Sequence, residues 1–67
     1  MIIKIWYVRS KKGISLRRLE ELTGISKSEI NLIEREDNKR SPTLDQLEKI
    51  AIALDVRITD LFDSEYK

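Results

Sequence analysis

The side chains of this 67-residue chain that could take part in chemistry are mostly charged, and the residue types that are absent exclude several functions. There are 13 Lys and Arg and 12 Asp and Glu, with neither His nor Cys. Without these two residue types a chain cannot build a zinc finger, a thiol nucleophile, a Ser-His triad or a histidine-ligated metal site. Asp60, Asp63 and Glu65 cluster in sequence, but a solvated C-terminal turn explains them better than a metal site does. We therefore expect neither an enzyme nor a bound cofactor or metal.

The cations are unevenly distributed along the chain. Residues 1–35 hold eight basic and four acidic residues, a net charge of +4, whereas residues 36–67 hold five and eight, a net charge of −3. This asymmetry suits a domain that turns one face towards phosphate, although a solvated surface of mixed charge is the alternative. Lys39 and Arg40 fall in residues 36–42, a polar stretch ending in Pro that we expect to be a loop. We interpret the two cations as phosphate clamps rather than ordinary solvated loop residues.

The segment that must position such a face is residues 16–35, which has the pattern of a helix, a tight turn and a second helix. Its apolar residues recur every three or four positions and are Leu16, Leu19, Leu22, Ile30 and Ile33. Gly24 can adopt positive φ and end the first helix, and Ser26 with Glu29 forms a capping box that starts the second. So short a turn predicts helix-turn-helix geometry, which presents its second helix to a DNA major groove.

The remaining elements are expected to support this pair. The pattern predicts a first helix over residues 1–12, ended by Gly13, with Met1, Ile5 and Val8 on its apolar face. Ile3, Trp6 and Tyr7 lie on its other side. We expect them to be covered by Leu61, Phe62 and Tyr66 of the same chain, or alternatively by a second subunit.

Further helix-start signals follow. Ser15 is placed to cap the second helix, and Thr43 with Gln46 forms a capping box for a helix ended by Asp55 and Val56. The apolar residues of that helix are Leu44, Leu47, Ile50, Ala51 and Leu54. Thr59 is expected to cap a last short turn, with a fraying tail over residues 63–67. We expect residues 1–67 to form one compact all-α domain of five helices. Because the apolar start is too short for an anchor and contains Lys4, we expect a cytoplasmic protein.

Together these features resemble the lambda repressor/Cro-type helix-turn-helix family, also called the XRE family. The resemblance covers residues 1–62 and is carried by L-x-x-L-x-x-x-x-G-I-S from Leu16, I-x-x-I-E-R from Ile30, P-T-L-x-x-L-x-x-I-A-x-A-L-D-V from Pro42, and D-L-F from Asp60. The Ser-Leu opening of the second helix and the LDV ending of the fourth resemble the DNA-binding half of SinR-like repressors. Within this family the fold is a compact five-helix domain with a central helix-turn-helix.

The resemblance also implies roles for individual residues. Arg9 and Glu34 match a structural ion pair. The base-reading positions are Lys27, Ser28, Asn31 and Leu32, and the phosphate-binding positions are Ser15, Arg17, Arg18, Arg35, Lys39 and Arg40. The chemistry of the base-reading residues is suitable, because Lys donates to guanine, Asn pairs with adenine and Leu contacts the thymine methyl. Two residues depart from the family: Leu16 replaces a usual Gln, and Glu20 replaces a small Ala. We expect the Glu20 carboxylate to find a cation, either Lys27 or Arg17.

The function implied is a sequence-specific DNA-binding transcriptional regulator. We expect a repressor that binds a near-palindromic operator as a homodimer through the major groove, with recognition helices ~34 Å apart. The residues expected at the dimer contact are Ile3, Trp6, Tyr7, Leu61 and Phe62. The alternative is a protein-interaction module, such as an antitoxin or an anti-repressor, which the acids Glu20, Glu21 and Glu29 near the DNA face would suit.

Overall fold

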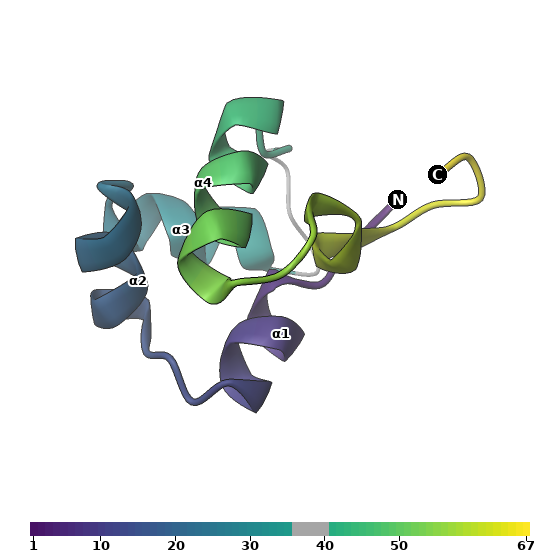
Figure 1. Cartoon of the computed structure of the whole chain (residues 1–67). Helices are drawn as coiled ribbons and strands as arrows, with labels where there is room; N and C mark the ends of the chain where they lie inside the picture. Colours follow the sequence, from purple (N-terminus) through teal and green to yellow (C-terminus); the bar gives the residue numbers. More distant parts are fainter. Residues whose placement is uncertain (36–40) are drawn as a thin grey trace.

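Four α-helices surround a small apolar core in the computed structural model, which describes residues 1–35 and 41–67 (Figure 1). The order of elements in these residues is β1 (Ile2–Ile3), α1 (Ile5–Lys11), α2 (Leu16–Thr23), α3 (Lys27–Glu34), α4 (Leu44–Leu54), the 3-10 helix η1 (Ile58–Leu61) and β2 (Phe62–Asp63). The expected helical domain is therefore confirmed, with four α-helices and a 3-10 helix in place of the fifth.

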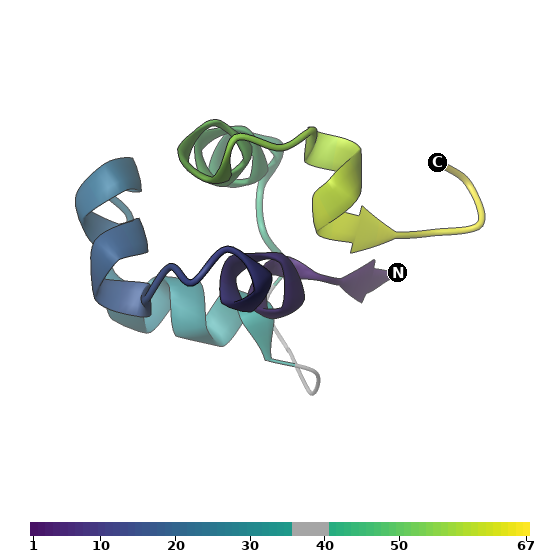
Figure 2. The ribbon, with the colours of Figure 1, turned by 60° about the horizontal axis from the view of Figure 1, so that its bottom comes forward.

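Every one of these helices contributes to the core. Its buried members are Ile5, Leu19, Ile30, Ile33, Leu47, Ile50, Ala51, Leu54 and Leu61. Helix α2 packs against both α3 and α4, and α4 also packs against η1. Figure 2 shows the result, with α3 at the bottom of the view, α4 at the top and α2 joining them on the left. The recognition-helix candidate α3 and the strongly periodic α4 thus lie on opposite sides of the core.

The predicted N-caps Ser15, Ser26 and Thr43 are confirmed. The predicted capping box of Ser26 and Glu29 is not, because only its Ser26 half is formed and the Glu29 carboxylate accepts from Gln46 Nε2 at 3.4 Å. The Ser15 hydroxyl accepts from the Arg18 backbone N–H at 3.0 Å, and the Ser26 hydroxyl accepts from that of Glu29 at 3.1 Å. Thr43 and Gln46 form a reciprocal capping box, with bonds of 3.1 and 3.0 Å. Each capping bond satisfies a backbone group that the first turn of a helix leaves without an intrahelical partner.

The first helix begins later than predicted. Residues 2–3 form a strand that pairs antiparallel with residues 62–63, placing Ile2 opposite Asp63 and Ile3 opposite Phe62. The Lys4 N–H then donates to the Leu61 carbonyl at 2.7 Å, so the chain turns into helix only at Ile5. Met1 is exposed and forms no part of a helical face. The helical prediction for residues 1–4 is wrong because their pairing partner lies about 60 residues away in sequence, beyond the reach of a local pattern.

The C-terminal residues also differ from the prediction. Thr59 lies inside η1, and it is the Arg57 N–H at the start of this turn that donates to the Asp60 carboxylate at 3.0 Å. Lys67 turns back, and its ammonium group donates to the carbonyls of Thr59 and Phe62 at 3.1 and 2.9 Å. Figure 1 shows that the two ends of the chain lie side by side and project from one side of the body.

Candidate nucleic-acid interface

The turn between α2 and α3 is tied by its own polar groups. Gly24 ends α2 at φ 77°, and its N–H donates to the Glu20 carbonyl at 2.8 Å. The Thr23 hydroxyl donates to the Leu19 carbonyl at 2.7 Å and accepts from the Ile25 N–H at 3.1 Å. Since these bonds occupy the donors and acceptors of the turn, they fix the angle at which α3 leaves α2.

Helix α3 has one buried and one exposed face. Ile30 and Ile33 are fully buried, whereas the four residues expected to read bases, Lys27, Ser28, Asn31 and Leu32, are all exposed. Their spacing of one and four residues places them along one side of the helix. This side therefore offers an ammonium donor, an amide with donor and acceptor, a hydroxyl and an apolar group, which are the groups that recognise base edges in a major groove.

Arg9 and Glu34, the two residues expected to pair, join α1 to α3. Two bonds connect the side chains, from Arg9 Nη2 to one Glu34 oxygen at 2.9 Å and from Nε to the other at 3.2 Å. The remaining guanidinium nitrogen donates to the Ile14 carbonyl at 3.0 Å. Only 11% of the Arg9 side chain and 4% of the Glu34 side chain are exposed. Such a bidentate, water-shielded pair fixes the C-terminal end of α3 against the body.

Glu20 has a partner that sequence reasoning missed. Its carboxylate accepts from the backbone N–H of Lys27 at 2.8 Å, and among the described residues it forms no ion pair with the side chain of Lys27 or Arg17. The expected cation is thus replaced by a backbone donor, because the first N–H groups of a helix have no intrahelical acceptor. A signal for this existed in the sequence, since Ser26 as N-cap satisfies the Glu29 N–H and leaves that of Lys27 open.

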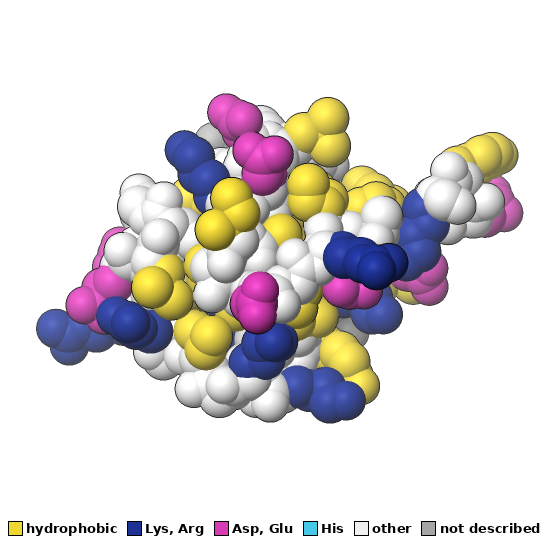
Figure 3. All heavy atoms as spheres, in the orientation of Figure 1, with side chains coloured by type: hydrophobic (Ala, Val, Ile, Leu, Met, Phe, Trp, Pro, Cys, Tyr) yellow, Lys and Arg dark blue, Asp and Glu magenta, His cyan; other side chains and the backbone are white. Residues whose placement is uncertain are grey.

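The residues expected to bind phosphate lie partly within the described structure. Ser15, Arg17, Arg18 and Arg35 are exposed, while Lys39 and Arg40 fall outside the described residues. The Ser15 oxygen already accepts from a backbone N–H, but its own O–H remains able to donate. Figure 3 shows the face that carries α4, where basic, acidic and hydrophobic side chains alternate rather than forming a patch of one sign.

The residues expected at a dimer contact separate into three groups. Trp6 and Tyr7 are 57% and 51% exposed, and Ile3 and Phe62 are partly buried against the core. Leu61 is fully buried, so its assignment to a dimer contact is wrong: the side chain fills the core instead of facing solvent. The C-terminal residues therefore cover Ile3 but leave Trp6 and Tyr7 accessible.

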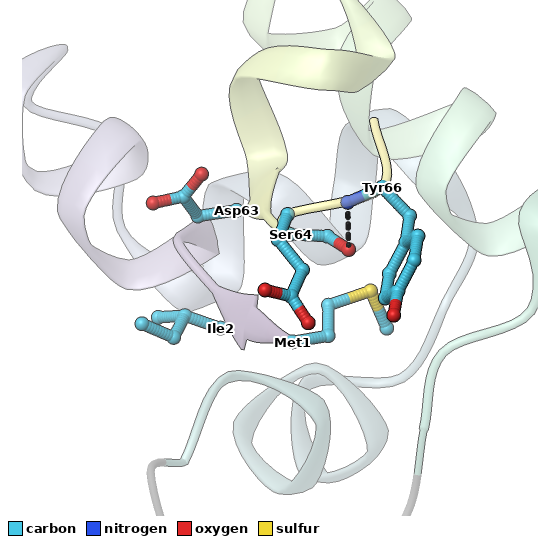
Figure 4. A pocket seen from close by; sticks show the side chains of 6 residues that line it. Met1, Ile2, Asp63, Ser64 and Tyr66 are labelled. Carbon is cyan, nitrogen blue, oxygen red and sulfur yellow. Dashed lines mark hydrogen bonds between the residues drawn. The ribbon is translucent and has the colours of Figure 1, made fainter.

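One hollow lies at the paired ends of the chain (Figure 4). It has a volume of about 500 Å³ and is lined by Met1, Ile2 and residues 63–66. Within it the Tyr66 N–H donates to the Ser64 hydroxyl at 3.1 Å. In the part of the chain that is described, no group of three or more Asp and Glu could hold a metal ion, and no helix is long and apolar enough to cross a membrane.

Comparison with known proteins shows which family has this arrangement of helices. Residues 4–66 match the family of Cro/C1-type HTH DNA-binding domains. The HTH-type transcriptional regulators SlrR and SinR of Bacillus subtilis (strain 168) are 38% and 36% identical over 64 residues, which are 96% of this chain but 40% and 57% of those proteins. SutR of Escherichia coli (strain K12) is 49% identical over 49 residues, 73% of this chain and 26% of its own length. The chain thus spans well under two thirds of the length of these relatives.

A solved structure agrees with these matches. The N-terminal DNA-binding domain of the master biofilm-regulator SinR from Bacillus subtilis superimposes with a TM-score of 0.75 at 37% identity, covering 100% of this chain and 97% of that one. The match includes all the described elements and therefore the α2-turn-α3 unit. The chain belongs to the family of Cro/C1-type helix-turn-helix DNA-binding domains, which is a family of transcriptional regulator domains and not of enzymes.

Proposed function

We propose that this chain acts as a repressor in the cytoplasm, binding a near-palindromic operator as a dimer with α3 in the major groove of each half-site. The observation that supports this is the exposure of Lys27, Ser28, Asn31 and Leu32 on one side of α3, while Ile30 and Ile33 anchor its other side. Arg17, Arg18 and Arg35 are exposed cations on the same helix pair and would contact phosphates, as would Lys39 and Arg40.

Dimerisation is part of the proposal because one small module makes few phosphate contacts and buries little area on DNA. Two copies related by a two-fold axis place their recognition helices about one helical turn, ~34 Å, apart and so require two inverted half-sites. The residues we propose for the contact between copies are Trp6 and Tyr7, with the partly buried Ile3 and Phe62 at its margin.

Selection of bound sites from a random duplex library tests the proposal directly. We expect recovery of two inverted half-sites with centres 10–10.5 base pairs apart. Asn31→Ala should relax the preference at one base pair, worth about 1–3 kcal/mol of discrimination. Arg17→Ala should instead weaken binding to all duplexes and lower the slope of log affinity against log salt by about one. Lys49→Ala is the control and should do neither, because Lys49 is an exposed residue of α4, the helix that Figure 2 shows on the opposite side of the core from α3.

Two outcomes would contradict parts of the proposal. Recovery of single half-sites without a partner would remove the dimer and the palindrome while leaving DNA recognition in place. Absence of salt-dependent binding to any duplex would overturn the DNA-binding role and favour the second candidate, a protein-binding module such as an antitoxin or an anti-repressor. Two observations favour this second candidate: Trp6 and Tyr7 are exposed, and the net charge of the chain is only +1.

A further inference from the structure

A carboxylate from α2 reaches the first backbone donor of the recognition helix. Glu20 Oε2 accepts from the N–H of Lys27, the first residue of α3, at 2.8 Å, and the Glu20 carbonyl accepts from the N–H of Gly24 at 2.8 Å. A single residue therefore holds both the start of the turn and the start of α3. The Glu20 residue is partly buried, whereas the bond from the Lys27 N–H to its carboxylate is exposed.

The bond matters for DNA binding because of where it lies. Residues at the N-terminal end of a recognition helix are those that contact base edges, and Lys27 and Ser28 stand at this end. A small shift of that end would move both side chains relative to the bases. At the same time the Glu20 carboxylate repels phosphates of any duplex, whatever its sequence. The two effects act differently, since the positioning benefits only a complex with base contacts and the repulsion acts on all complexes.

We propose that Glu20 is a positioning residue for sequence recognition, which sets the N-terminal end of α3 for base contact and makes binding to random DNA weaker. This inference rests on the proposed function. It explains how a large acid is accommodated at a helix crossing on the side of the molecule that approaches DNA. It also predicts that sequence selectivity depends on the hydrogen bond to Lys27 and that overall affinity depends on the charge.

Three substitutions separate the bond from the charge. Glu20→Gln keeps a carbonyl oxygen that can accept from Lys27 but removes the charge. Glu20→Asp keeps the charge but is one methylene too short to reach. Glu20→Ala removes both. Glu48→Gln is the matched control, because it makes the same change of charge at an exposed position of α4, which Figure 2 shows on the opposite side of the core from α3.

The assay is the dissociation constant for a random duplex and for the duplex selected above, measured at several salt concentrations. Glu20→Gln should bind both duplexes roughly two- to threefold more tightly at low salt, the effect of one unit charge ~8 Å from a phosphate in water, and this gain should vanish at high salt. The selectivity ratio, which is the dissociation constant for the random duplex divided by that for the selected duplex, should stay unchanged. In Glu20→Asp and Glu20→Ala that ratio should fall by about fivefold or more, with faster amide exchange at Lys27 than in the unsubstituted chain.

The results that would overturn the inference are distinct from those that would overturn the function. An unchanged selectivity ratio in Glu20→Asp, or an equal gain in affinity from Glu48→Gln, refutes the role of Glu20 while the unsubstituted chain still binds its selected duplex. If the unsubstituted chain binds no duplex, both proposals fall. Should Glu20→Ala fail to fold, as judged by far-UV circular dichroism, Glu20→Gln and Glu20→Asp still decide the outcome.

Discussion

Replacing Arg9 by Met should be among the most damaging single changes to this fold. The guanidinium makes two bonds to Glu34 and one to the Ile14 carbonyl, and the Glu34 side chain is only 4% exposed. Without Arg9 the Glu34 carboxylate would be buried with no cation beside it. Breaking a buried pair in this way typically lowers the free energy of unfolding by about 3–5 kcal/mol. A single small core rarely supplies more than about that much, so most of the stability would be lost.

The measurement is urea and thermal unfolding followed by far-UV circular dichroism. At about 4–8 °C per kcal/mol for a domain of this size, the Tm of Arg9→Met should fall by at least about 12 °C. Combining Arg9→Met with Glu34→Leu should restore part of the loss, because the double change removes the unpaired charge as well. Asp63→Asn is the control: Asp63 pairs with Lys67 at 3.7 Å while 60% exposed, and its loss should change stability by less than about 1 kcal/mol. A change under about 1 kcal/mol in Arg9→Met, or a double variant no more stable than the single one, would refute the reasoning.

Three further changes test the helix ends. Gly24→Ala should destabilise by about 1–2 kcal/mol in urea unfolding, because its φ is 77° and a Cβ would meet no atom within 4 Å, so that backbone strain alone is measured; no loss would mean that the turn relaxes. Asp55→Gly should raise the free energy of unfolding by about 0.5–1 kcal/mol, and with it the Tm, since Asp55 ends α4 at φ 56°, a conformation that glycine adopts more easily. A lower Tm would point to an unrecognised role of the carboxylate. Thr43→Ala should cost about 1 kcal/mol by calorimetry through loss of the cap on the Gln46 N–H, and an unchanged transition would show that the capping box contributes nothing.

The parts of the fold that follow from neighbours in sequence could be predicted. Ser15, Ser26 and Thr43 mark the starts of α2, α3 and α4, because each cap bonds a backbone N–H three residues ahead. The exposed side of α3 followed from the same local logic, since the phase of Ile30 and Ile33 determines which residues point outward.

The parts that depend on distant partners could not be predicted in this way. Three of the four residues from Ile2 to Ile5 are isoleucine, a composition that suits either a strand or a helix. Only the pairing of residues 2–3 with residues 62–63 makes the start of this run a strand. Leu61 is equally apolar in a surface contact and in a core, and its burial depends on how η1 folds over α1 and α4. The partner of Glu20 was missed because charge suggested a cation, whereas the nearest open donor in space was a backbone N–H.

The pairing of β1 with β2 brings the two ends of the polypeptide to one place, with residue 2 opposite residue 63. A short peptide linker could therefore join residue 67 to residue 1 and turn the chain into a ring without disturbing any helix. Such a ring would lose less conformational freedom on folding than the open chain does, because its ends would already be held together when unfolded. It would also allow the backbone to be opened at a new point, so that each connection between helices could be cut in turn and its importance for DNA binding compared.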